Sequence, residues 1–101
     1  MYISRLKSPS TDLLAKALLS LESEEECYRF MEDLLTVREI RDLSQRLEVA
    51  MLLKDKVTYN DIVERTGVST ATIGRVNRSL TYGAGGYMSV IEKIARDKKD
   101  D

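Results

Sequence analysis

The sequence has no histidine and a single cysteine, Cys27. Without histidine the chain lacks the commonest general base and a common metal ligand. One cysteine cannot form an internal disulfide, which fits a reducing compartment. The longest apolar run, VAMLL at residues 49–53, is far shorter than the roughly 18 residues of a membrane-spanning helix. The opening MYISRLKSPS also lacks the apolar stretch of a secretory signal. We therefore expect a soluble, cytoplasmic protein with no membrane partner.

The sequence also offers little for catalysis or for a metal ion. Ser69 and Ser79 have no base partner visible in the sequence, and Cys27 falls on an apolar helix face, where it reads as a core residue. The acidic cluster at residues 22–26 could suggest a divalent metal, but consecutive glutamates at a helix start favour the helix dipole without any ion. The prediction is a protein that is not an enzyme, holds no metal and requires no cofactor.

The charge of the chain is unevenly distributed. The 101 residues carry a net charge of −1, with 43% hydrophobic and 33% charged residues, which describes an ordinary globular protein of one domain. Residues 21–33 are strongly acidic, whereas residues 65–91 contain three arginines and no acid. A local basic face can therefore meet phosphates even though the whole chain is slightly acidic. The alternative is that the charges are scattered at random and the basic segment has no such role.

The apolar residues recur at helical spacing throughout, and nothing alternates as a strand does. Ser8, Ser23, Thr36, Thr58 and Ser69 each stand where a helix cap is expected. The fold class predicted is all-α, with about six helices. The first helix is expected at 9–21, and the second opens at Ser23 and carries Leu34 on its apolar face. The other expected ranges are 37–54, 59–66, 70–80 and 87–96, with YGAGGY at residues 82–87 as a loop. Tyr82 and Tyr87 are interpreted as anchors of this loop to the core, with stacking on a ligand or a DNA sugar as the alternative.

Residues 58–80 match the requirements of a helix-turn-helix. Thr58 can cap a short helix, Gly67 can take the left-handed conformation that ends it, and Ser69 can restart the chain. Ile73 and Val76 then face inward on the second helix. We predict that this second helix reads the major groove of double-stranded DNA. The residues assigned to DNA binding are Thr58, Ser69, Thr70, Ala71, Thr72, Gly74, Arg75, Asn77 and Arg78.

These residue types suit close approach to bases and phosphates. Arginine pairs bidentately with guanine and asparagine with adenine, and the methyl groups of Ala71 or Thr72 can touch thymine. Hydroxyls and helix-start N–H groups suit phosphates. Two alternatives stay open: the same pair of helices occurs in many α-bundles, and it could grip another transcription protein as an interaction module. Weak dependence of binding on salt would favour the interaction module.

Two stretches of sequence, GVSTATIGRVNRSL at residues 67–80 and LLTxxExxxLxxR at residues 34–46, resemble the Trp repressor family. SQRLEVA, TYNDI and RVNRSLxYGxGGY resemble its YerC/YecD-type branch. The resemblance covers residues 28–82 well and the first 20 residues poorly. It implies an intertwined all-helical homodimer that regulates transcription, as a repressor. The DNA-binding helix-turn-helix would lie at residues 58–80, and dimerisation would involve mainly residues 9–54 and 87–97.

The resemblance also implies a pocket for a small co-repressor. Arg46 and Arg75 match the two arginines between which the family's repressors hold tryptophan, and Thr72 and Ser79 match polar neighbours. Val76 replaces a glycine of those repressors and can fill the pocket, which counts against tryptophan. The connection from Arg46 to Thr58 is also one residue shorter. The alternative for Arg46 is an exposed charge paired with a carboxylate on its own helix.

Overall fold

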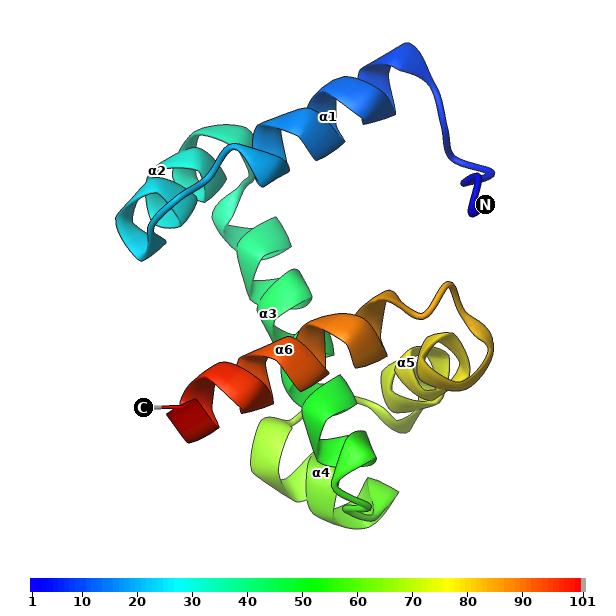
Figure 1. Ribbon diagram of the computed structural model, residues 1–101. Helices are drawn as coiled ribbons and strands as arrows, with labels where there is room; N and C mark the ends of the chain where they lie inside the picture. The colour runs from blue at the N-terminus through cyan, green and yellow to red at the C-terminus, as the bar shows by residue number, and fades with distance from the viewer. Residues whose placement is uncertain (101) are drawn as a thin grey trace. The chain divides into compact units, whose positions relative to one another are not determined.

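The computed structural model describes residues 1–100, with side chains as far as Asp97, and this part of the chain contains six α-helices and no strand (Figure 1). The all-α class is therefore confirmed. The helices are α1 (Pro9–Leu19), α2 (Glu24–Leu34), α3 (Val37–Lys54), α4 (Tyr59–Thr66), α5 (Thr70–Tyr82) and α6 (Gly86–Asp100). The chain divides into two compact units, residues Met1–Val37 and Arg38–Asp101.

The first unit contains α1 and α2, each opened by a serine cap. Ser8 Oγ accepts a hydrogen bond from the backbone N–H of Thr11, and Thr11 Oγ1 accepts one from the backbone N–H of Ser8. This reciprocal capping box, with Pro9 in the first turn, fixes the start of α1. α1 ends at Leu19, two residues before the expected end, because the backbone N–H and hydroxyl of Ser20 bond back to carbonyls of the last turn.

No residue of α1 or α2 is buried. The leucines that recur at helical spacing along α1 are largely open, with Leu14 42% and Leu18 53% exposed, and Leu34 of α2 is 50% exposed. Cys27 is half-buried. One copy of the chain therefore leaves apolar surface on this unit in contact with water.

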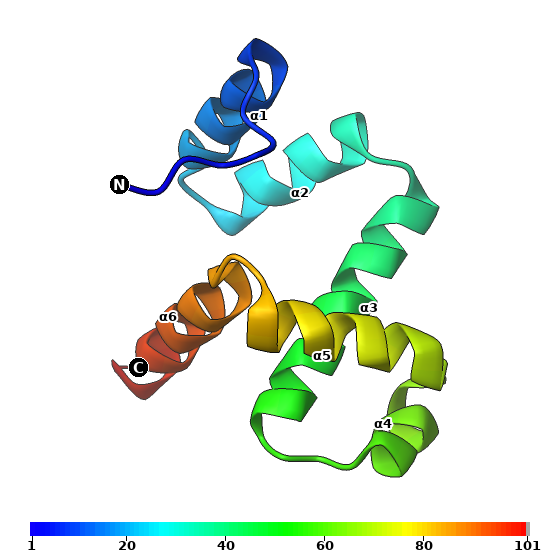
Figure 2. The same ribbon diagram turned by 90° about the vertical axis from the view of Figure 1, so that its right-hand side faces the viewer.

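The second unit is built around a small core to which four helices and one turn contribute. Its buried residues are Val49, Ala50, Ile62, Val68, Ile73, Val76 and Ile91. α3 supplies the first two from its C-terminal half, whereas Leu43, two turns before Ala50 on the same helix, is 47% exposed. α5 packs against both α4 and α6, and Figure 2 shows α5 crossing α3 with α4 near its beginning and α6 beyond its end.

The connection between α5 and α6 is shorter than the expected loop. Tyr82 still belongs to α5, and α6 begins at Gly86, so that only residues 83–85 connect the two helices. A Cβ atom on Gly83 would collide with the carbonyl oxygen of Ser79, and Gly85 has a φ of 85°. Both positions therefore favour glycine, for steric and conformational reasons respectively. α6 also continues to Asp100, beyond the expected end near Arg96.

Candidate nucleic-acid interface and adjoining pocket

Residues 58–82 form two short helices joined by a tight turn. Thr58 Oγ1 caps α4 by accepting from the backbone N–H of Asp61 at 3.2 Å, and Gly67 ends the helix with a φ of 73°. The backbone N–H of Gly67 donates to the carbonyl oxygen of Val63 at 2.8 Å. These local features confirm the predicted caps and the predicted left-handed glycine, and together they form the turn of a helix-turn-helix.

The apolar side of the turn fixes how the two helices sit on each other. Ile62 and Ile73 are fully buried, and Val68, in the turn itself, is 7% exposed. Thr66 adds a polar link, because its hydroxyl donates to the Ile62 carbonyl and accepts from the backbone N–H of Val68. Burying an isoleucine side chain contributes on the order of 2–3 kcal/mol, so this contact can hold α5 in a defined orientation.

The outer side of α5 is open and basic. Thr70, Ala71, Arg75 and Arg78 are exposed, while Gly74 and Asn77 are partly buried. No ion pair involves either arginine in the part of the chain that the structure describes, and α5 carries no carboxylate. The face therefore presents free guanidinium groups beside residues with little or no side chain, as insertion into a DNA groove requires.

The two capping hydroxyls assigned to DNA binding, those of Thr58 and Ser69, differ in whether they already donate a hydrogen bond. Ser69 Oγ accepts from the backbone N–H of Thr72, and its hydroxyl donates to Thr72 Oγ1, each over 3.2 Å. The Thr58 hydroxyl only accepts, within the described residues, so its hydrogen is free to donate to a phosphate. A phosphate contact from the Ser69 side chain would have to replace its bond to Thr72.

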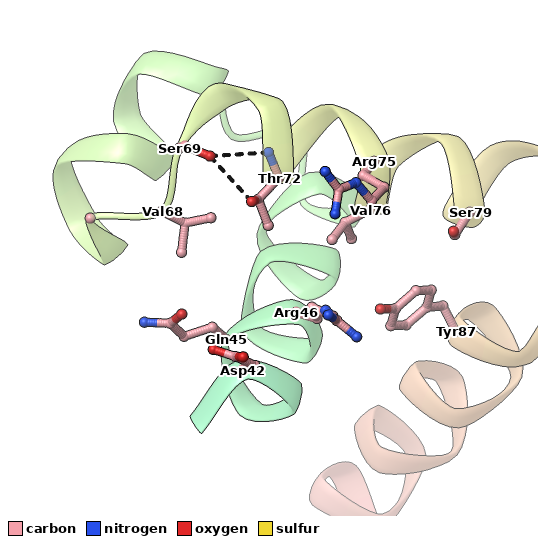
Figure 3. Close-up of a pocket in the computed structure, with 11 residues that line it drawn as sticks. Asp42, Gln45, Arg46, Val68, Ser69, Thr72, Arg75, Val76, Ser79 and Tyr87 are labelled. Carbon is pink, nitrogen blue, oxygen red and sulfur yellow. Dashed lines mark hydrogen bonds between the residues drawn. The ribbon is translucent and has the colours of Figure 1, made fainter. Parts of the chain in front are cut away.

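A cavity of about 520 Å³ lies between α3, the turn, α5 and the start of α6 (Figure 3). The structure brings together the four residues assigned to an effector, Arg46, Thr72, Arg75 and Ser79, in the lining of this cavity. The lining is completed by Asp42, Gln45, Gly67, Val68, Ser69, Val76 and Tyr87. Thr72 thus lines the cavity and also lies in the first turn of α5.

The electrostatics of the cavity are set by two arginines and one carboxylate. Arg46 is exposed and makes no ion pair with any residue that the structure describes, so its expected alternative partners on α3 do not engage it. In Figure 3 its guanidinium lies beside the phenol of Tyr87, whose hydroxyl points toward it, while Arg75 reaches in from α5. Neither guanidinium group is paired with a residue that the structure describes, so two positive charges against the single carboxylate of Asp42 give the cavity a net positive charge.

Sequence reasoning linked Tyr87 to a ligand only as an alternative, through stacking, and did not link five other lining residues to an effector: Asp42, Gln45, Gly67, Val68 and Ser69. On α3, Gln45 directly precedes Arg46, and Asp42 lies one helical turn before it. Helical spacing from Arg46 could therefore have identified Asp42 from the sequence. Tyr87 could not be found in this way, because it comes from α6, a different element. Tyr87 also packs against the core, as the anchoring interpretation expected, whereas Tyr82 is 84% exposed and anchors nothing.

Comparison with known proteins decides the family. A model of the family described as Trp repressor protein matches residues 10–95. The chain belongs to the Trp repressor family. The match extends over the N-terminal helices as well, where the resemblance in sequence was weak. The Trp repressor family consists of DNA-binding regulators of transcription rather than enzymes.

Individual members of the Trp repressor family are also similar to this chain. It is 47% identical over 94 residues to the uncharacterized protein YerC of Bacillus subtilis (strain 168), covering 93% of this chain and 90% of that protein. The crystal structure of a candidate Trp repressor from Staphylococcus aureus superposes with a TM-score of 0.86 at 46% identity, covering 94% of this chain and 95% of the other. The crystal structure of a TrpR-like protein from Eubacterium eligens ATCC 27750 superposes with a TM-score of 0.85 at 52% identity, covering 90% of this chain and 94% of the other.

None of the described helices combines the length and apolarity needed to span a bilayer. No cluster of three or more histidine, cysteine, aspartate or glutamate side chains suited to a metal ion lies among the described residues.

Proposed function

We propose that the protein is a homodimeric, sequence-specific transcriptional repressor that inserts α5 into the major groove of double-stranded DNA. The observation that carries this proposal is the outer face of α5, where two arginines, without an ion-pair partner among the described residues, stand among small side chains on a helix held by a buried core. Membership of the Trp repressor family supplies independent support.

The homodimer is supported by the first unit. α1 and α2 bury no residue, and their exposed leucines are apolar surface that a second copy can cover. A two-fold dimer buries the same face twice and presents two α5 helices to one DNA duplex. Helix-turn-helix dimers of this kind contact half-sites about 34 Å apart on one side of the DNA.

The test is selection of binding sites from genomic fragments, followed by footprinting and titration at several salt concentrations. We expect two protected half-sites about one helical turn apart, and an affinity that falls steeply with salt, because each phosphate contact contributes about 0.9 to the log–log slope. Failure to bind any duplex at low salt would refute the proposal. Binding to a transcription protein with little salt dependence would instead support the interaction-module alternative.

We further propose that the cavity beside α5 holds a small anionic effector. Arg46 and Arg75 supply two guanidinium groups, which suit a carboxylate or a phosphate, and Thr72 and Ser79 add hydroxyls. Val76 is 4% exposed and occupies space beside these groups, which disfavours the flat ring system of tryptophan.

The experiment is calorimetric titration of the protein with tryptophan, with a small dicarboxylate and with inorganic phosphate. We expect binding of one of the two anions, little binding of tryptophan, and loss of anion binding in Arg46→Gln. Arg65→Gln is the control, because Arg65 is exposed on α4 outside the cavity. Preference of the unaltered protein for tryptophan, or equal loss in both variants, would contradict this assignment.

A further inference from the structure

Tyr82 is a large aromatic residue that does not pack against the core. It is the last residue of α5 and is 84% exposed, whereas Tyr87, near the start of α6, packs against the core. The side chain of Tyr82 makes no hydrogen bond or ion pair in the described part of the chain. An exposed tyrosine presents both a flat apolar ring and a hydroxyl to a partner.

Its position on the helix aligns it with the reading face. Ala71, Arg75, Arg78 and Tyr82 are spaced by four, three and four residues, so they form one stripe along α5. The buried residues Ile73 and Val76 lie on the other side of the helix. Tyr82 therefore points the same way as Arg78, one turn further along the helix.

The length of this stripe places Tyr82 at the edge of a groove. At 1.5 Å per residue, Ala71 and Arg78 are about 10 Å apart along the helix axis, which fits within a major groove about 12 Å wide. Tyr82 lies about 16 Å from Ala71, beyond that width. If the stripe from Ala71 to Arg78 meets the bases, Tyr82 stands at the level of the sugar–phosphate backbone.

The end of α5 also holds Tyr82 in place. The backbone N–H of Gly83 donates to the Ser79 carbonyl at 2.9 Å, so the last turn that carries Tyr82 is closed by a hydrogen bond. A side chain at Gly83 would collide with that carbonyl, so only glycine allows the chain to leave the helix this closely. Tyr82 is thus presented by a helix rather than by a free loop.

We propose that Tyr82 contacts the DNA backbone at the edge of each half-site, its hydroxyl donating to a phosphate oxygen and its ring covering the adjacent deoxyribose. Tyrosine is among the side chains that make such contacts, and residues 65–91 contain no acid that would repel the phosphate. The contact adds affinity without reading sequence. The inference rests on the proposed binding of DNA by α5.

The test compares Tyr82→Ala, Tyr82→Phe and Tyr2→Ala in titrations of the full chain with its selected duplex and with an unrelated duplex. Tyr2 is a suitable control because it is 72% exposed and lies outside the segments assigned to DNA binding and to dimerisation. We expect Tyr82→Ala to weaken binding about 5- to 20-fold, by a similar factor on both duplexes, and Tyr82→Phe to lose part of that factor. Ethylation of the phosphate at the edge of the half-site should no longer interfere with binding by Tyr82→Ala.

The other outcomes separate this inference from the proposed function. If Arg78→Ala weakens binding but Tyr82→Ala does not, the function stands, and α5 enters the groove by its N-terminus with Tyr82 clear of the DNA. If the unaltered protein binds no duplex, the function itself fails. A lower melting temperature or a dissociated dimer in Tyr82→Ala would assign Tyr82 to folding or assembly and overturn the inference.

Discussion

Ser69 and Thr72 are joined by two hydrogen bonds across the first turn of α5, each of 3.2 Å. The backbone N–H of Thr72 donates to Ser69 Oγ, and the Ser69 hydroxyl donates to Thr72 Oγ1. The pair fixes the beginning of α5, and Thr72 also lines the cavity beside that helix. The same serine thus supports a helix that is proposed to lie against negatively charged DNA.

This pair predicts different effects for two substitutions of Ser69. Ser69→Ala removes the cap and should lower the free energy of unfolding by about 1 kcal/mol. Ser69→Asp keeps an oxygen that caps the helix, so stability should be largely retained. Its negative charge should nevertheless weaken DNA binding, because it lies at the end of α5 that approaches the phosphates. Chemical denaturation and DNA titration of both variants would check this, and tight binding by Ser69→Asp would place the start of α5 away from DNA.

Arg78 should carry part of the sequence preference. It is exposed on the outer face of α5 and has no ion-pair partner among the described residues. Arg78→Ala should weaken binding to the selected site by about 1–3 kcal/mol and relax the preference at one base pair. Competition titrations with duplexes altered at single positions measure this preference. An equal loss on every duplex would assign Arg78 to a phosphate instead.

Gly74 should separate helix stability from DNA binding. It lies inside α5, and a Cβ atom there would meet nothing within 4 Å. Gly74→Ala should therefore stabilise the helix by about 0.5–1 kcal/mol. The added methyl group stands on the side that approaches the bases, so DNA affinity should fall. Thermal unfolding combined with DNA titration is the measurement, and unchanged affinity would show that Gly74 does not face the groove closely.

Gly67→Ala is the matched comparison and should act in the opposite sense on stability. A Cβ atom at Gly67 would also meet nothing within 4 Å, but its φ of 73° lies in the left-handed region. The substitution should cost about 1–2 kcal/mol through backbone strain alone. Denaturation of both glycine variants tests this contrast, and equal stability of the two would contradict a strained turn.

Assembly should depend on the open leucines of the first unit. Leu18 is 53% exposed on α1, and a dimer interface that covers it would not accept a charge. Leu18→Glu should shift the protein from dimer to monomer in sedimentation at micromolar concentration. Ser10→Glu, which adds the same charge to an exposed position of α1, should leave the dimer intact. Sedimentation of the unaltered chain as a monomer would contradict the dimer.

The parts of the fold that depend on local chemistry were predictable from the sequence. Caps at Ser8, Ser23, Thr58 and Ser69 and the left-handed turn at Gly67 are confirmed, because each requires particular residues within a few positions. Helical spacing also placed Ile73 and Val76 in the core correctly.

Features that depend on contacts between distant segments were less accessible. Leu14 and Leu18 form an apolar stripe in sequence, yet that spacing alone does not say whether the same chain covers it. Tyr82 and Tyr87 belong to one glycine-rich motif but have opposite environments, since one ends α5 in solvent and the other packs on the core. The assignments of individual residues to DNA or effector binding stay predictions.

Arg75 lines the cavity and is also exposed along the reading stripe of α5. If one guanidinium group takes part in both sites, ligand binding in the cavity and DNA binding to α5 influence each other. Whatever factor a cavity ligand imposes on the affinity for DNA, DNA must impose on the affinity for that ligand. The DNA site would then act as an effector of the protein that binds it, because the protein bound to DNA would have a different affinity for the small molecule than the free protein.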